Sequence, residues 1–337
     1  MPSPEDIFRR EQSIEFSCNY ENFNIQYFAM AKLIISIDLG GTNLKVALLD
    51  SHYKFKDKQV LSTRRFIKKE ELIAAITDSI KTIIARNGLS PKDILGVGLG
   101  LPGPIDIKRG IVHFFPNIPG WKQVNLKNIL EKRLNLKVFL DNDANLMCLA
   151  EYRLGAAKGA KNAVCLTLGT GVGGGIIIEG KLYHGSSFAA GEVGHIPINE
   201  NGPRCNCGSN ACLESYIGNN RIESFAKKIL RRKISLEDLS RLAKKQNKLA
   251  RHIWSKVGER LGIGLSGVVN LLNPDTIVIG GGVAGAGEIL FSKVRETLLK
   301  RAMSVQARHA KILKARLGSD AGLIGAAILV KESIKYN

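Results

Sequence analysis

The sequence lacks several features that would place it in particular classes of protein. None of its apolar runs approaches the roughly 20 residues that a membrane-spanning helix needs, and its N-terminus lacks the basic-then-apolar order of a signal peptide. Aromatic residues make up only 6% of the chain, which disfavours a surface that stacks nucleic-acid bases. We therefore expect a cytoplasmic protein that binds neither membranes nor nucleic acid.

Acidic residues are scarce beside basic ones: 30 Asp and Glu stand against 49 Lys and Arg, a formal charge of +19. Such a balance would suit an anionic partner such as a nucleotide. The basic residues are dispersed, however, with short clusters only at 227–233 and 293–316. Solvated helix faces are the favoured explanation, so the charge says little about function. The length of 337 residues allows two domains with substantial cores.

Cysteine is also rare, yet three of the six cysteines lie within eight residues, at Cys205, Cys207 and Cys212. With His195 they form the pattern H-x9-C-x-C-x4-C. Three thiolates and an imidazole complete a tetrahedral site with no open position, which is typical of structural zinc. A redox cluster of thiols is the alternative, which the nearby histidine disfavours. Two acids, Glu192 and Glu214, flank this pattern, and a bound metal would fix their separation.

The segment 33–50 reads as a strand, a glycine turn and a second strand, because branched apolar residues fill 33–37 and 46–49. Adjacent glycines let backbone N–H groups approach a polyphosphate, a threonine offers a hydroxyl, and an aspartate can hold a metal-bound water. These residues are Gly40, Gly41, Thr42 and Asp38. An ordinary glycine hairpin is the alternative.

Residues 163–180 repeat this design, with Thr167 at the position of Asp38. Gly169, Gly171 and Gly174 match GxGxxG, but the strand that follows at 176–178 rules out a dinucleotide-binding fold, which needs a helix there.

A second GxGxxG, at Gly280, Gly282 and Gly285, lies between a predicted strand at 276–279 and a predicted helix from 288. No Asp or Glu occurs from 297 to 319, where an acid would bind ribose, so a Rossmann domain is disfavoured although a nucleotide could still contact this turn.

Helical spacing and start signals predict the remaining elements. The predicted helices cover 68–86, 143–155, 221–230, 236–273 and 320–335, and further strands cover 94–99 and 137–140. Asp141 or Asp143 could cap the helix that starts near Asp143, but one cap explains one acid and not the Asp-Asn-Asp cluster. Asn117 lies between two prolines that could aim its amide at a sugar hydroxyl, although it could equally stabilise its own turn.

Assembled in this order, the motifs resemble the ROK family of sugar kinases, and its bacterial glucokinases in particular. The most specific parts are GEVGH at 191–195 and CNCGSNACLE at 205–214. Where the family pattern has glycine before the third cysteine, this chain has Ala211; if that position needs a positive φ, the turn must differ slightly.

The resemblance implies an α/β protein with an actin-like ATPase (duplicated ribonuclease H-like) fold, in which two α/β domains surround a cleft. Residues 1–32 would be an extension with no clear period, 33–153 the small domain and 154–318 the large domain with the zinc knuckle at 195–212. The last helix, 319–337, would return to the small domain. Relatives of this kind are commonly dimers or tetramers.

The same resemblance implies the site. Asp143 would be the catalytic base, and Asn117, Asn142, Glu192, His195 and Glu214 would bind sugar hydroxyls. The zinc ligands would be His195, Cys205, Cys207 and Cys212. ATP, with Mg²⁺, would contact residues of three glycine turns and a nearby lysine: Asp38, Gly40, Gly41, Thr42, Lys45, Gly169, Thr170, Gly171, Gly280, Gly281 and Gly282.

The implied reaction is ATP-dependent phosphorylation of a hexose at its 6-hydroxyl, with glucose as the first candidate. N-acetylmannosamine, N-acetylglucosamine, mannose and fructose remain open as substrates. A sugar-sensing transcriptional regulator and a chaperone-like ATPase of the same fold are the alternatives from other classes.

Overall fold

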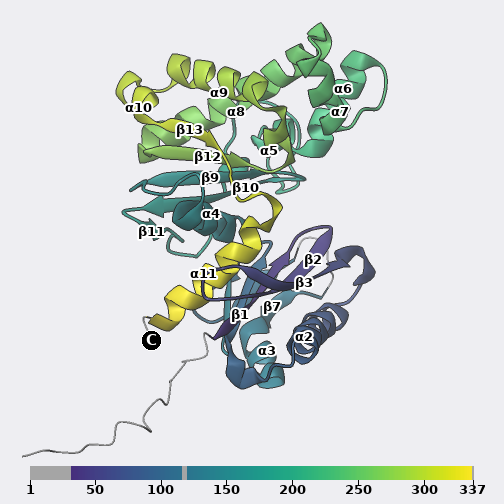
Figure 1. Ribbon diagram of the computed structural model, residues 1–337. Helices are drawn as coiled ribbons and strands as arrows, with labels where there is room; N and C mark the ends of the chain where they lie inside the picture. The colour runs from purple at the N-terminus through teal and green to yellow at the C-terminus, as the bar shows by residue number, and fades with distance from the viewer. Residues whose placement is uncertain (1–31, 116–119, 336–337) are drawn as a thin grey trace, which may run out of the picture. The chain divides into compact units, whose positions relative to one another are not determined.

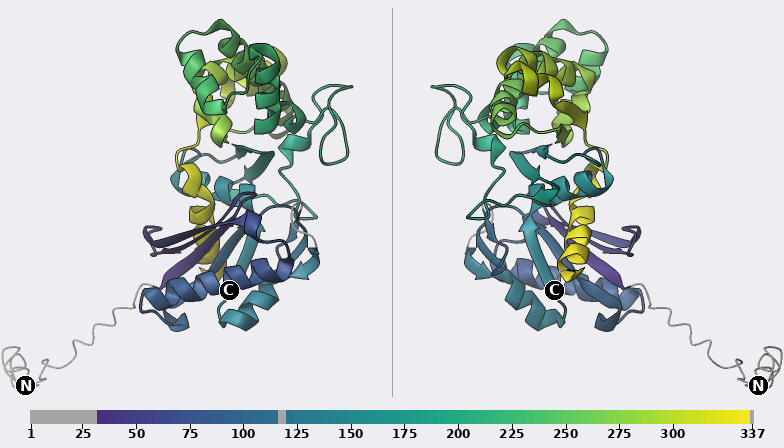
Figure 2. Two further views of the ribbon diagram at one scale, coloured as in Figure 1. Left: turned by 90° about the vertical axis from the view of Figure 1, so that its right-hand side faces the viewer. Right: turned by 90° about the vertical axis from the view of Figure 1, so that its left-hand side faces the viewer.

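The computed structural model describes residues 32–115 and 120–335 (Figures 1 and 2). The expected extension at the N-terminus and the expected sugar contact of Asn117 lie outside the described residues. Among those described, no helix is both long enough and apolar enough to cross a bilayer.

Two five-stranded sheets repeat one topology. Their strand orders are β3-β2-β1-β4-β8 and β11-β10-β9-β12-β13. In each sheet the first three strands are antiparallel and the last three are parallel. The first sheet comprises β1 (Leu33–Leu39), β2 (Asn43–Leu49), β3 (Phe55–Ser62), β4 (Ile94–Leu101) and β8 (Val138–Asn142). The second comprises β9 (Ala163–Leu168), β10 (Val172–Ile178), β11 (Lys181–Leu182), β12 (Thr276–Gly280) and β13 (Lys311–Lys314).

The strand register confirms the predicted duplication. Asp38 pairs with Lys45 across the first hairpin and with Gly100 on the parallel neighbour β4. Thr167 pairs in the same way with Gly173 and with Gly280 on β12. Asp38 and Thr167 therefore occupy the same position in the two sheets.

Helices cover the sheets, and a small third sheet of β5 (Ile105–Asp106), β6 (Ile111–Phe114) and β7 (Lys122–Asn125) joins the first (Figure 1). The first sheet packs against α2 (Lys69–Arg86) and α3 (Leu126–Leu134). The core of the second half includes α6 (Asn219–Leu230), α7 (Leu236–Lys244), α8 (Lys248–Leu272), α9 (Glu288–Arg301) and α10 (Ser304–His309). The remaining helices are α4 (Asp143–Leu154), α5 (Glu214–Ile217) and α11 (Ala321–Lys335).

The apolar spacing predicted most of these elements within a few residues. The helix predicted over 236–273 is wrong in one respect, because it is two helices. Gln246 takes a positive φ of 65°, and the Asn247 side chain then accepts a hydrogen bond from the backbone N–H of Ala250, which caps α8. A capping side chain between two apolar faces is therefore what divides this stretch.

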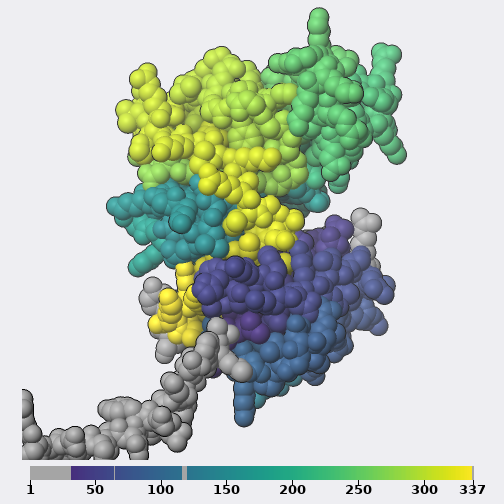
Figure 3. All heavy atoms as spheres, in the orientation of Figure 1, coloured from purple at the N-terminus to yellow at the C-terminus, as the bar shows by residue number. Residues whose placement is uncertain are grey.

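The helices α4 and α11 cross in close backbone contact. A Cβ on Gly325 of α11 would lie 1.9 Å from the carbonyl oxygen of Leu146 on α4. A Cβ on Gly98 of β4 would lie 2.2 Å from the carbonyl oxygen of Ala326. In the space-filling view, yellow atoms of the C-terminal segment lie between teal and purple parts of the chain (Figure 3). Helix α11 thus packs against α4 on one side and the first sheet on the other.

Substitution of Gly325 by Ala tests this contact. The added methyl group has no space against a backbone oxygen, so we expect a loss of about 1–3 kcal/mol in the free energy of unfolding, measured with urea. The matched control is Gly267→Ala in α8, where a Cβ meets nothing within 4 Å. That change should stabilise the protein by about 0.5–1 kcal/mol, as Ala does over Gly inside a helix. Equal effects of the two substitutions would contradict the close crossing.

Candidate active site

A cavity of about 270 Å³ is lined by residues from both halves of the fold. Four residues expected at the nucleotide or at the reacting groups line it: Asp38, Asp143, Gly280 and Gly281. A larger cavity of about 970 Å³ opens beside α6 and α7 and is lined mainly by charged and polar side chains, none of them an expected site residue. The chemistry therefore identifies the smaller cavity as the candidate site.

Asp38 is held at the end of β1 by a lysine and by the start of α11. Lys45 Nζ lies 3.1 Å from Asp38 Oδ2 and also donates to the carbonyl oxygen of Ser319. A Cβ on Gly322 would lie 2.9 Å from the Asp38 carboxyl carbon, so the absence of a side chain there makes room for that carboxylate. The N-terminus of α11 is thus close to the Asp38 carboxylate.

The third glycine turn lines this cavity with Gly280 and Gly281, and it packs against the backbone that leads into the second turn. The N–H of Gly169 donates to the carbonyl oxygen of Gly171 within the second turn. In the third turn Gly281 takes a φ of 84° and has no space for a Cβ, because that atom would lie 2.2 Å from the carbonyl oxygen of Leu168. The second and third turns therefore touch each other. Five of the residues expected to contact ATP are exposed to solvent: Gly41, Thr42, Thr170, Gly281 and Gly282.

Asp143 is the first residue of α4, and the cap of that helix is its neighbour. Asn142 Oδ1 accepts from the backbone N–H groups of Ala144 and Asn145, at 2.9 and 3.3 Å. The sequence-based alternative that Asp141 or Asp143 caps the helix is therefore wrong, and the Asp143 carboxyl is left for another role.

The electrostatic environment of Asp143 is unusual. Burial raises the pKa of its carboxyl from 3.8 to about 7, and the negative charges of Asp38 and Glu192 add to this rise. A hydrogen bond from the N–H of Ala144 acts in the opposite direction. This carboxyl therefore changes its charge near neutral pH, and it lines the same cavity as Asp38, Gly280 and Gly281.

The remaining expected sugar contacts lie around the knuckle. Glu192 Oε2 is 3.7 Å from His195 Nε2, and the negative charge of Glu192 contributes to the raised pKa of Asp143. Asp143, Glu192 and His195 therefore lie near one another. Glu214 begins α5, and its Oε2 accepts from the N–H of Val172 at 2.9 Å. Glu214 thus contacts the second glycine turn as well as the knuckle.

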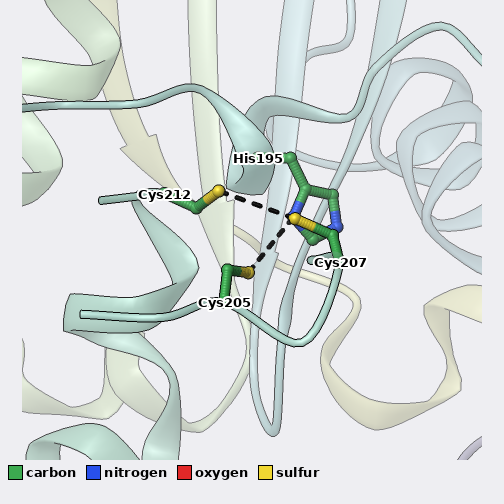
Figure 4. A group of neighbouring side chains, drawn as sticks. All are labelled: His195, Cys205, Cys207 and Cys212. Carbon is green, nitrogen blue, oxygen red and sulfur yellow. Dashed lines mark hydrogen bonds between the residues drawn. The ribbon is translucent and has the colours of Figure 1, made fainter. Parts of the chain in front are cut away.

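The four expected metal ligands come together as predicted (Figure 4). One ligand atom from each of His195, Cys205, Cys207 and Cys212 lies within 4.8 Å of the others. Cys205 Sγ is 3.6 Å from His195 Nδ1, so one ring nitrogen faces the thiols while the other faces Glu192. Ala211 takes the positive φ of 56° that the turn needs, in place of glycine.

Sequence reasoning missed part of the cavity wall. Thr167, Lys314, Ser319 and Gly322 also line it. Ser319 carried a signal as a helix start, but nothing in the local pattern showed that the start of α11 would face Asp38 from the far end of the chain.

The chain matches the model of the ROK family over residues 34–333. It is 35% identical over 320 residues to a glucokinase of Thermotoga maritima, which spans 90% of this chain and 99% of that protein. It is 32% identical over 310 residues to a xylose repressor of Caldicellulosiruptor bescii, which spans 88% of this chain and 77% of that protein.

A solved structure shows the same fold. A ROK family glucokinase from Streptomyces griseus, in complex with glucose and AMPPNP, has a TM-score of 0.77 at 32% identity, over 89% of this chain and 99% of that chain. The duplicated sheets, the knuckle and the family match agree, and this chain, with two α/β domains of the actin-like ATPase fold, belongs to the ROK family.

Proposed function

We propose that this protein transfers the terminal phosphoryl group of ATP to the 6-hydroxyl of a hexose, with glucose as the first candidate. The observation that carries the proposal is the carboxyl of Asp143, which lies at the start of α4 and lines a cavity together with Asp38 and the glycine turn at 280–281. The similarity to proteins named glucokinase supports the same reaction.

In this reaction Asp143 accepts the proton of the sugar 6-hydroxyl while that oxygen attacks the γ-phosphorus and the bond to ADP breaks. A base works best when its pKa is near the operating pH, and the pKa of about 7 meets this condition. Phosphoryl transfer asks the protein mainly for positioning and charge neutralisation. Mg²⁺, held by ATP and Asp38, would supply part of that neutralisation when bound.

The sugar is held by polar groups on both sides of Asp143. Asn142 precedes it, while Glu192, His195 and Glu214 surround the knuckle. Each can pair with hydroxyl groups, and a sugar of the wrong configuration would leave some of these groups unpaired once the bound sugar covers them. Asn117 belongs to this proposal on sequence grounds alone.

The knuckle fits zinc, since three thiols and one imidazole nitrogen converge within 4.8 Å. Zinc bound there would tie His195 to the segment that leads into α5, and so fix Glu192 relative to Glu214.

The similarity to a xylose repressor favours a sugar-responsive regulator as the second candidate. ADP release, measured across glucose, mannose, fructose, N-acetylglucosamine and N-acetylmannosamine, decides between them. We expect sugar-dependent release, fastest with glucose. Saturable glucose binding without any ADP release would contradict the kinase and favour the regulator.

Substitution of Asp143 by Asn tests the base. Because the amide cannot accept the proton, we expect ADP release to fall by at least about 10²-fold. In the unsubstituted enzyme only the ionised carboxyl is active, so kcat/KM at low substrate should rise up to about pH 7 and then level, and Asn should abolish this dependence. Asp78→Asn, on the exposed face of α2, is the matched control and should leave both unchanged. Near-normal rates in the Asp143 variant would remove it from this role.

Removal of the metal tests the knuckle. After a chelator has extracted zinc and been removed, we expect loss of activity and faster proteolysis within 199–210, a segment that is almost wholly exposed. Added zinc should reverse both effects. Full activity in protein shown by metal analysis to be zinc-free would refute the assignment.

A further inference from the structure

A buried carboxylate beside the catalytic one has no part in the mechanism above. Asp141 is 1% exposed and precedes Asn142 at the end of β8. Its Oδ2 lies 2.7 Å from Nε2 of His184, which follows β11 in the second sheet. The pair therefore joins the last strand of the first sheet to the segment that follows the second sheet's strand β11.

The other oxygen of Asp141 is tied to the helix that carries the base. Asp141 Oδ1 accepts from the N–H of Asn142 at 2.7 Å and from Nδ2 of Asn145 at 2.9 Å. The amide oxygen of Asn145 is buried and has no hydrogen-bond partner among the described residues. The bond from the amide nitrogen of Asn145 to Asp141 therefore orients this side chain. A shift of Asp141 would thus displace the first turn of α4.

His184 opens the loop that delivers Glu192. Its carbonyl oxygen accepts from the N–H of Ala190 at 3.1 Å, which closes the loop 184–190. The next residue, Gly191, packs so tightly on β10 that a Cβ would lie 2.6 Å from the carbonyl oxygen of Gly174. The loop also contacts the first half of the chain through Phe188, whose ring centroid is 5.7 Å from Lys108 Nζ.

We propose that Asp141 and His184 are positioning residues that hold the loop 184–190, and with it Glu192 and His195, in register with the start of α4. This inference rests on the proposed sugar site and adds to it the pair that fixes its two sides. A buried carboxylate that loses its partner is unfavourable, so the pair constrains the loop strongly. The loss of this pair should weaken sugar binding more than nucleotide binding, because neither residue lines the cavity that includes Asp38, Gly280 and Gly281.

The test is His184→Ala beside His184→Gln, which can still donate to Asp141. We expect the alanine substitution to raise both the KM for glucose and the dissociation constant of glucose by about tenfold. The kcat should stay within threefold, and the KM for ATP within twofold, of the values for the unsubstituted protein. The glutamine variant should stay within threefold of the unsubstituted protein in all of these. The matched control is His309→Ala, which removes a histidine paired with Asp275 at 3.1 Å outside the cavity and should change none of them.

An unchanged KM for glucose in His184→Ala would overturn the proposal, and so would equal losses for glucose and ATP, which indicate a general structural role. If that variant does not fold, the cycle of Asp141→Asn and His184→Phe, which keeps a ring but loses the donor, decides. Non-additive effects on glucose binding support a coupled pair, whereas additive effects contradict it. Glucose binding by calorimetry needs no turnover, so this result is independent of whether the unsubstituted protein releases ADP.

Discussion

The pKa of the Asp143 carboxyl is set by opposing interactions, and the proposed chemistry of the site depends on their balance. Burial and the nearby charges of Asp38 and Glu192 disfavour its ionised form, while the N–H of Ala144 at the start of α4 favours it. A carboxyl on an open surface would titrate near its ordinary value and be a weaker base at neutral pH. The cavity thus sets the chemistry through desolvation as much as through contacts.

The duplicated topology explains why such a cavity exists. Each sheet ends its first strand in a glycine turn, and the equivalent residues Asp38 and Thr167 face the same space. Close crossing of α4 and α11 at Gly325 lets both helices approach it, one bringing Asp143 and the other Gly322. Glycine is required at these approaches because the backbone of Leu146 leaves no room for a Cβ at Gly325, and the carboxylate of Asp38 leaves none at Gly322.

Much of this could be predicted from the sequence, since the decisive signals are local. The two strand–turn–strand units, the amphipathic α2 and the spacing of the three knuckle cysteines each depend on short segments. The break between α7 and α8 was missed because Asn247 interrupts a stretch whose apolar spacing continues on both sides. Within Asp-Asn-Asp, the capping residue depends on where β8 ends, and that is set by pairing with β4.

Contacts between distant segments could not be predicted in this way. Lys45 reaches Ser319, and Asp141 reaches His184, without any pattern that links them in the sequence. The sequence therefore predicts which residues carry the chemistry better than it predicts which residues hold them in place.

The most direct measurement is a carbon-13 NMR titration of the side-chain carboxyls, with Asp143→Asn used to assign the resonance of Asp143. A midpoint near pH 7 that disappears in the variant, and that shifts when glucose is added, is the expected result. A midpoint near pH 4 that glucose does not change would contradict the role of Asp143 as the base that faces the sugar.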